Sequence, residues 1–288
     1  MTEHVRADAD AIAIRGEGGI RASEVVVGAA TDVGRLRTIN EDGYLAIAPA
    51  FVVVDGMGGH AAGRMATQVA LDSLYSLAGA TVTDVDTVVR AVVAAQEAIM
   101  AIPSHAAYLP GATIAGVILA WVADEQGVTR PTWVIFNIGD ARVYLLRGDM
   151  LSQVTRDHSR VQILIETGEL TPEQARRDPR RNIVTRALGG GIADSGVPDL
   201  YTVPVAAGDR FLICSDGLSD ELDDEAIATV LAAGCTAQRT AELLVAASLE
   251  GGGHDNTTAV VVDSLQVPTP PLGARAFHPG DASSQGAQ

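Results

Sequence analysis

The stretch Phe51-Val-Val-Val-Asp55-Gly-Met-Gly-Gly-His60-Ala-Ala-Gly63 decides how the fold of this chain is interpreted. Its four apolar residues, three of them β-branched, are typical of a buried strand, and a carboxylate, Asp55, follows them. The glycines beyond it lead into a segment with helical spacing, Ala61 to Leu77. The stretch therefore predicts a strand, a carboxylate and a glycine-rich turn ahead of a long helix.

The same association of an apolar strand with a carboxylate occurs three more times. Asp140 follows residues 134–139, Asp216 follows residues 211–215, and Asp255 with Asn256 precedes residues 257–262. An Asp-Gly pair between apolar runs is also a common hairpin turn, and each aspartate alone is open to that interpretation. Together the four predict carboxylates that meet at one rim of a sheet, where cations must compensate their like charges. Oxygen ligands alone indicate Mg²⁺ or Mn²⁺ rather than zinc.

The alternation of short and long periodic segments indicates the fold class. Short β-branched runs predict strands over 25–29, 44–47, 51–54, 132–138, 142–146, 211–214 and 257–262. Helical spacing predicts helices over 61–77, 84–102, 224–233 and 236–249. Two tight links, Gly139-Asp140-Ala141 and Gly148-Asp149, are expected to be hairpins that make this part of the sheet antiparallel. Because each apolar helix face needs a surface to bury, we expect an α+β protein whose sheets are covered by long helices.

The charge balance limits the partners and the chemistry of this chain. Its 288 residues carry 20 arginines, no lysine and 36 acidic residues, a formal net charge of −16. This charge argues against nucleic acids and anionic membranes as partners. The absence of lysine excludes Walker A loops, kinase active sites and Schiff-base chemistry.

We expect one folded catalytic domain over residues 24–264, between a flexible tail at 1–23 and a disordered tail at 265–288. The first tail has no sustained periodicity, and the second is rich in Pro, Gly, Ser and Ala. No apolar stretch reaches the roughly 18 to 20 residues that span a bilayer. Two cysteines, Cys214 and Cys235, are too few for a disulfide scaffold or a thiolate zinc site, and we expect a cytoplasmic location.

Two further kinds of site are excluded by local pattern. Ala61 stands where a dinucleotide-binding loop has its third glycine. Neither cysteine is followed six positions later by an arginine, as a cysteine-based phosphatase loop requires. Covalent catalysis by cysteine is therefore not expected.

Seven motifs stand in order along the chain. They are Arg37-Thr-Ile-Asn40-Glu41-Asp42, residues 55–63, Gly111-Ala-Thr113, Gly139-Asp140-Ala-Arg142-Val-Tyr144-Leu, Thr155-Arg-Asp157-His158-Ser159, Cys214-Ser-Asp216-Gly217-Leu218 and Asp255-Asn256-Thr257. Together they resemble the metal-dependent serine/threonine protein phosphatases of type 2C, particularly the bacterial members. The resemblance implies a central antiparallel β-sandwich flanked by pairs of helices, in four layers. It also implies hydrolysis of phosphoserine and phosphothreonine in proteins, opposing bacterial serine/threonine kinases.

The resemblance also implies a metal centre of two Mn²⁺ or Mg²⁺ ions, with a third beside them. The implied ligands are Asp55 between the first two ions, the Gly56 carbonyl with Glu41 and Asp42 on one of them, Asp216 and Asp255 on the other, and Asp140 with Asp216 at the third. A simple turn aspartate is the alternative interpretation of Asp140.

Arg37 resembles the phosphate clamp of the family, and a guanidinium fork suits a tetrahedral dianion. A solvated surface arginine is the alternative. The implied mechanism is in-line attack on phosphorus by a metal-bridging water, without a phosphoenzyme. The leaving oxygen takes its proton from a metal-bound water or from a histidine, for which His60 is the nearest candidate by sequence. In many relatives that histidine directly follows the Asp-Gly pair, where this chain has Met57.

The segment between Ser159 and Leu188 corresponds to the flap of bacterial relatives, and it contains several arginines. We expect Arg180 and Arg181 to attract acidic, phosphorylated substrates, with a solvated helix end as the alternative. The expected partners are phosphorylated Ser/Thr proteins, including kinases, and the chain is expected to be a monomer. A catalytically silent relative that binds phosphoproteins is the alternative function, but the full set of predicted ligands favours an enzyme.

Overall fold

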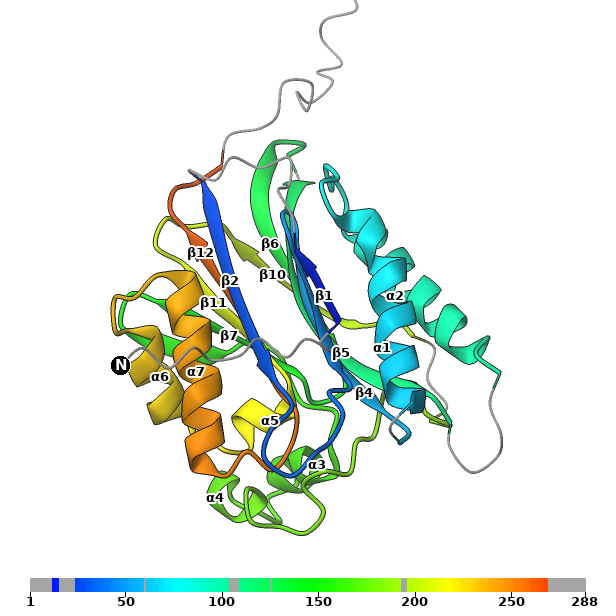
Figure 1. Cartoon of the computed structure of the whole chain (residues 1–288). Coiled ribbons are helices and arrows are strands. Elements are labelled where there is room, and N and C mark those ends of the chain that lie inside the picture. The colour runs from blue at the N-terminus through cyan, green and yellow to red at the C-terminus, as the bar shows by residue number, and fades with distance from the viewer. Residues whose placement is uncertain are drawn as a thin grey trace, which may run out of the picture.

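The computed structural model describes residues 12–15, 24–59, 61–103, 109–124, 126–192 and 196–268. Two β-sheets lie face to face at its centre (Figure 1). Sheet A has the strand order β1-β3-β4-β5-β6-β10, with β9 paired to β5. Its strands are β1 (Ile12–Arg15), β3 (Asp42–Ile47), β4 (Ala50–Met57), β5 (Gly111–Ala123), β6 (Thr129–Ile138), β9 (Leu188–Gly189) and β10 (Asp199–Pro204). Its strand pairs are antiparallel except β1 with β3, which run parallel.

Sheet B has the strand order β2-β12-β11-β7-β8, and its neighbouring pairs are antiparallel. Its strands are β2 (Val25–Asp32), β7 (Arg142–Arg147), β8 (Met150–Gln153), β11 (Arg210–Cys214) and β12 (Thr257–Ser264). The two sheets pack through large side chains such as Trp133 and Phe211, whose ring centroids lie 5.3 Å apart in an edge-on contact. A closely packed apolar layer therefore joins the sheets.

Helices cover the outer face of each sheet (Figure 1). Sheet A is covered by α1 (Ala61–Leu74), the 3₁₀ turn η1 (Tyr75–Leu77) and α2 (Val85–Met100), and sheet B by α6 (Asp224–Leu231) and α7 (Ala237–Gly251). Three short helices, α3 (Arg160–Glu166), α4 (Pro172–Ala175) and α5 (Asp216–Ser219), lie at the lower end of the sandwich in this view. The predicted α+β sandwich in four layers is confirmed.

The helices α2, α3, α4, α6 and α7 begin at a residue whose side chain caps the helix. Asp84 accepts a hydrogen bond from the Thr87 amide at the start of α2, and Thr236 caps α7 in the same way through the Arg239 amide. The buried faces of α1 and α2 pack on sheet A in one apolar cluster, and those of α6 and α7 pack on sheet B in another. Hydrophobic burial on both outer faces holds the four layers together.

The link Gly139-Asp140-Ala141 corrects one prediction. It is not a hairpin, because β6 belongs to sheet A and β7 to sheet B, and the chain crosses between the sheets at this point. Gly139 has φ = 104°, a backbone conformation that favours glycine, which permits the abrupt change of direction. The second link, Gly148-Asp149, is the predicted hairpin between β7 and β8.

The structure also contains elements that the periodicity did not predict. β5 was not predicted as a strand because it is rich in glycine and alanine and has few adjacent β-branched residues; it lies between β4 and β6, with its first eleven residues buried. Within the predicted tail at 1–23, residues 12–15 form β1, which is held by main-chain pairing with β3. The predicted domain bounds stay predictions. The rest of that tail, and residues 269–288 of the other, lie outside the described residues. No helix in the described ranges is long and apolar enough to cross a membrane.

Candidate metal centre

The first two predicted ligands face each other across one hairpin. Asp42 is the first residue of β3 and pairs in register with Asp55 of β4. The sequence pattern predicted that Asp55 follows the end of its strand. In the structure Asp55 lies inside β4. Two carboxylates on paired strands at this spacing repel each other unless a proton or a cation lies between them.

The other three aspartates reach the same place from different elements. Asp140 lies in the crossing after β6, Asp216 is the first residue of α5, and Asp255 lies in the loop before β12. The carboxylates thus come from the shared end of two sheets, not from one rim of a single sheet as predicted. They surround a cleft of about 260 Å³, lined by Arg37, Glu41, Asp55, Gly56, Met57, Gly58, Gly59, Thr113, Asp140, Asn182, Val184, Asp216, Asp255 and Asn256.

Asp42 lies behind this cleft in a buried polar network. Its Oδ2 atom accepts hydrogen bonds of 2.7 Å from the hydroxyls of both Ser215 and Thr258. Thr258 is contacted in turn by Thr31, whose hydroxyl also accepts from the Asn40 amide. No sequence pattern identified these hydroxyl residues as supports, because Ser and Thr at strand ends have many roles. The network holds Oδ2 of Asp42 in place and provides no hydrogen bond to Oδ1.

Close backbone packing brings Glu41 and the Gly56 carbonyl to the same side. A Cβ atom on Gly63 of α1 would lie 2.4 Å from Glu41 Oε1 and 2.8 Å from the Gly56 carbonyl carbon. A Cβ on Gly56 would lie 2.5 Å from the Gly63 carbonyl oxygen. Only glycine fits at both positions, so α1 begins against the ligand-bearing strand. This explains the glycines of the motif at residues 55–63 without any dinucleotide site.

Burial and mutual repulsion raise the pKa values of the two central carboxylates. Removal from water is the largest cause at both, and it raises the pKa of Asp55 and of Asp216 well above the usual range. The charge of Asp216 is the next cause at Asp55, and the charge of Asp140 is the next cause at Asp216. Both side chains are half-buried and border the cleft, so a cation there can replace the protons they retain.

The two outer carboxylates are shifted in the same direction. Burial raises the pKa of Asp140 to about 7, with the charge of Asp157 adding to the effect. Burial raises the pKa of Asp42 to about 6, although the hydrogen bonds from Ser215 and Thr258 act in the opposite sense. The acidic residues that line the cleft therefore outnumber its one lining arginine, Arg37.

The donors present fit a divalent cation. Within the described ranges no three His, Cys, Asp or Glu side chains are already arranged to hold a metal ion. Asp255 is paired with Arg37, and Asp42 accepts hydrogen bonds from two hydroxyls. Yet Asp42 Oδ1 is buried and receives no hydrogen bond from the described part of the chain. Asp55 can supply one only while it carries a proton itself. A hard cation with oxygen ligands satisfies these groups without that proton.

Arg37 lies at the mouth of the cleft with half of its side chain exposed. Its Nη2 atom is 2.6 Å from Asp255 Oδ2. The guanidinium is thus held beside the carboxylates and still faces solvent, as a group that binds an incoming anion must. His60, the candidate proton donor, lies outside the described residues.

Asn256 supports the site in a way that the sequence analysis did not assign. Its Oδ1 atom accepts from the Glu41 amide at 2.8 Å, and its Nδ2 atom donates to the carbonyls of Val33 and Ile39. One side chain therefore holds the loop that carries Arg37 and Glu41 against the loop that carries Asp255. The adjacent Asp-Asn pair in the sequence was the available signal.

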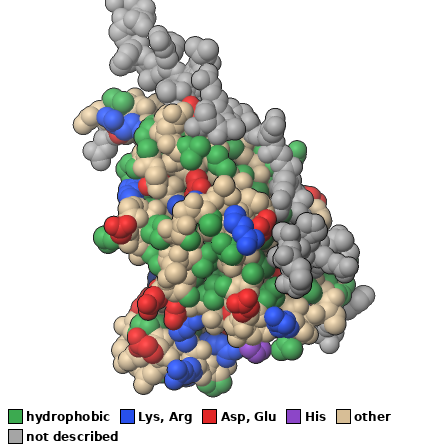
Figure 2. Space-filling model, turned by 60° about the vertical axis from the view of Figure 1, so that its left-hand side comes forward, with side chains coloured by type: hydrophobic (Ala, Val, Ile, Leu, Met, Phe, Trp, Pro, Cys, Tyr) green, Lys and Arg blue, Asp and Glu red, His purple; other side chains and the backbone are tan. Residues whose placement is uncertain are grey.

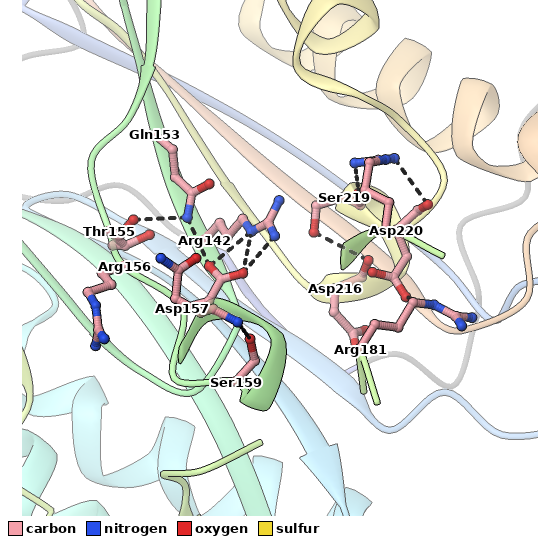
Figure 3. Close-up of polar contacts among 12 residues, drawn as sticks. Arg142, Gln153, Thr155, Arg156, Asp157, Ser159, Arg181, Asp216, Ser219 and Asp220 are labelled. Carbon is pink, nitrogen blue, oxygen red and sulfur yellow. Dashed lines mark hydrogen bonds and ion pairs between the residues drawn. The ribbon is translucent and has the colours of Figure 1, made fainter. Parts of the chain in front are cut away.

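A second cavity of about 790 Å³ continues from the cleft and shares Asp140, Asn182 and Asp216 with it. Its floor contains Arg142, which is bidentate to Asp157 (Figure 3). Arg142 also donates a hydrogen bond to the Tyr144 hydroxyl. The walls are α3 and α4 of the flap on one side and α5 and α6 on the other. The cavity gives an elongated ligand room beside the carboxylates.

The two flap arginines have partners within the protein. Arg180 is paired with Asp178, and Arg181 Nε lies 3.4 Å from Asp220 Oδ2. Arg181 lines the larger cavity and Arg180 does not. Acidic and arginine side chains are mixed at the lower end of the face in Figure 2, the end at which Figure 1 shows α3 and α4. A role of these arginines in binding substrates stays a prediction.

Comparisons with known proteins agree with this arrangement. The family model described as protein phosphatase 2C matches residues 38–251. The serine/threonine protein phosphatase PstP of Mycobacterium tuberculosis is 38% identical over 240 residues, which cover 82% of this chain and 44% of PstP. The chain thus spans under half the length of that relative. The serine/threonine phosphatase stp of Listeria innocua is 33% identical over 243 residues, which cover 81% of this chain and 93% of stp.

A solved structure resembles the fold as well. The catalytic domain of PstP in complex with two manganese ions superposes with a TM-score of 0.70 at 35% identity, covering 83% of this chain and 98% of that domain. The chain belongs to the protein phosphatase 2C family.

Proposed function

We propose that this chain is a metal-dependent protein phosphatase that hydrolyses phosphoserine and phosphothreonine in proteins. The observation that carries the proposal is the gathering of Asp55, Asp140, Asp216 and Asp255 around one cleft with Arg37 at its mouth. A cleft with this excess of negative charge repels a phosphate dianion unless cations occupy it. The same cleft loaded with divalent ions attracts that dianion.

Two Mn²⁺ or Mg²⁺ ions supply Lewis acidity and a water of lowered pKa when bound. Asp55 is the proposed carboxylate between them, with Glu41, Asp42 and the Gly56 carbonyl on one side. Asp216 and Asp255 are proposed on the other side, and Asp140 with Asp216 for a third, weaker ion. The two manganese ions of the PstP complex support a centre of two ions.

Arg37 orients the phosphoryl group in this proposal. Its guanidinium now donates to Asp255 in the cleft, and half of its side chain is exposed. An arriving phosphate monoester offers a second acceptor with tetrahedral oxygens that match the guanidinium fork. A metal-bound water and His60 stay the two predicted sources of the proton for the leaving oxygen.

The cysteines support direct hydrolysis without a covalent intermediate. Cys214 is completely buried, and burial raises the pKa of its thiol to about 12. A thiol of this kind is not a nucleophile at neutral pH. It lies on β11, just ahead of Asp216, where its role is to pack.

The chain's partners follow from the same chemistry. Phosphorylated proteins, bacterial serine/threonine kinases among them, are the proposed substrates, and the high negative charge supports the absence of nucleic acid and anionic membrane partners. The monomeric state and the cytoplasmic location predicted from the sequence stay predictions.

The test is hydrolysis of a phosphothreonine peptide across a Mn²⁺ titration, with a chelator and the Asp216→Asn protein as controls. We expect metal-dependent turnover that both controls abolish, because the substitution removes the charge of a shared ligand. Retained activity of Asp216→Asn at saturating Mn²⁺ would refute the ligand assignment. A wild type that binds Mn²⁺ but hydrolyses neither the peptide nor a small aryl phosphate supports the alternative, a silent phosphoprotein-binding relative.

A further inference from the structure

His158 belongs to a motif that the proposed function does not use, and it is almost completely buried. Its Nδ1 atom accepts a hydrogen bond of 3.0 Å from the amide of Gly139. Its own amide donates to the Gly139 carbonyl at 2.8 Å. One residue therefore holds both polar groups of the glycine that precedes Asp140.

This glycine controls where the Asp140 carboxylate points. Gly139 has φ = 104°, and a Cβ there would lie 2.3 Å from the Cβ of Thr113, so the turn is pressed against β5. Asp140 is itself 8% exposed and lines both cavities, yet its carboxylate has no hydrogen-bond donor among the described side chains. The carboxylate is thus placed by its backbone alone, and His158 fixes that backbone.

The other ring nitrogen of His158 is held from the opposite side. Because Nδ1 is an acceptor, Nε2 carries the proton and donates to Asp199 Oδ2 at 3.2 Å. Arg186 Nη1 lies 2.6 Å from Asp199 Oδ1 and holds that carboxylate in place. The contact of Nε2 with Asp199, which Arg186 holds in place, therefore supports this tautomer and fixes the orientation of the imidazole.

The same residue is attached to the end of the flap. The Thr185 amide donates to the His158 carbonyl at 2.7 Å, and Ser159 and Val184 form a β-bridge. Val184 lines the metal cleft. His158 thus connects the turn that carries Asp140 with the flap segment that borders the substrate.

We propose that His158 is a positioning residue that holds the Asp140 carboxylate at the cleft. It also connects the turn that carries Asp140 to Val184 and Thr185 near the end of the flap. The inference rests on the proposed function in that Asp140 is taken as a ligand of the third ion. It gives the Thr155–Ser159 motif a role, through the acceptor nitrogen of its histidine.

Two substitutions test the roles of the two ring nitrogens of His158 separately. In His158→Asn the side-chain oxygen reaches about where Nδ1 lies and preserves an acceptor for the Gly139 amide. In His158→Gln the polar group reaches about where Nε2 lies, and that acceptor is lost. The Asp263→Asn protein is the control for stability, since it weakens a half-buried pair with Arg210 at the far end of β12.

The first measurement is Mn²⁺ binding by isothermal titration calorimetry, which does not depend on activity. We expect His158→Gln to weaken the last-bound Mn²⁺ by about 10-fold, the usual effect of losing an outer support of a metal site, and to reproduce the isotherm of Asp140→Asn. We expect His158→Asn and Asp263→Asn to bind Mn²⁺ within about 3-fold of the wild type. If His158→Gln does not fold, Asp199→Asn replaces it, with an expected loss in the same direction.

Steady-state kinetics on a phosphopeptide provide the second readout. At saturating Mn²⁺ we expect His158→Gln to raise KM more than it lowers kcat, because the flap end moves with it. Wild-type binding of Mn²⁺ by His158→Gln, or identical isotherms for the wild type and Asp140→Asn, would overturn the proposal. If the wild type hydrolyses no peptide while His158→Gln still loses Mn²⁺ affinity, the proposed function fails and the positioning role stands.

Discussion

Replacing Asp140 with asparagine is expected to stabilise the metal-free protein at neutral pH. The carboxyl is buried, and its pKa rises from the ordinary value of 3.8 to about 7 in the folded chain. Between pH 3.8 and pH 7 the folded state keeps a proton on Asp140 that the unfolded state releases, so the free energy of unfolding falls as the pH rises. The contribution of this group to stability is therefore complete below pH 3.8 and is lost once the pH has risen through 7. The full difference is on the order of 4 kcal/mol, at about 1.4 kcal/mol for each tenfold change in proton affinity.

The assay is thermal unfolding of both proteins in a chelating buffer from pH 4.5 to pH 8. Asparagine has nearly the shape of the protonated carboxyl, and no hydrogen-bond donor among the described side chains is lost with the substitution. We expect similar Tm values at pH 4.5 and an advantage of roughly 10 °C for Asp140→Asn at pH 8, since ~1 kcal/mol moves the Tm of a domain of this size by ~2–4 °C. Subtracting the Tm of the wild type from that of Asp140→Asn at each pH cancels the effect of the other ionisable groups, which the two proteins share.

Mn²⁺ provides the matched comparison. At pH 8 a saturating concentration is expected to stabilise the wild type more than Asp140→Asn, because a cation compensates the charge that only the wild type carries. The reasoning is refuted if the metal-free gap stays constant from pH 4.5 to pH 8, or if Asp140→Asn melts below the wild type at pH 8.

Three more substitutions test other parts of the site. Arg37→Ala is expected to raise KM for phosphopeptides several-fold while Mn²⁺ affinity changes little, and a normal KM in steady-state kinetics would identify it as a surface residue. Reversing the charge of Arg180 and Arg181 to glutamate is expected to slow the turnover of acidic phosphopeptides at low salt, and unchanged turnover there contradicts the proposed attraction. Gly63→Ala is expected to lower both Tm and Mn²⁺ affinity although alanine favours helix by about 1 kcal/mol, since its Cβ would lie 2.4 Å from Glu41 Oε1; a raised Tm in thermal unfolding would show that the contact relaxes.

The sequence alone determined the layers of this protein and most of its charged site. β-Branched runs and helical spacing are properties of a few neighbouring residues, so the strands over 44–47 and 211–214 and the long helices were predictable. Asp55 and Asp216 were identified because each stands next to an apolar run. β5 was missed because its sequence is rich in glycine and alanine, which favour strands weakly, and has few adjacent β-branched residues.

The tertiary structure decided which sheet each carboxylate comes from and what supports it. Asp42 and Thr258 are 216 positions apart in the chain, and Asp42 and Ser215 are 173 apart, yet both pairs are hydrogen-bonded at 2.7 Å. Likewise, the crossing at Gly139 looks like a hairpin in sequence, and only the pairing of β6 and β7 with different partners shows otherwise. Local periodicity reports which residues are buried, whereas the direction of a side chain at the metal cleft depends on contacts between segments that meet only when the two sheets pack together.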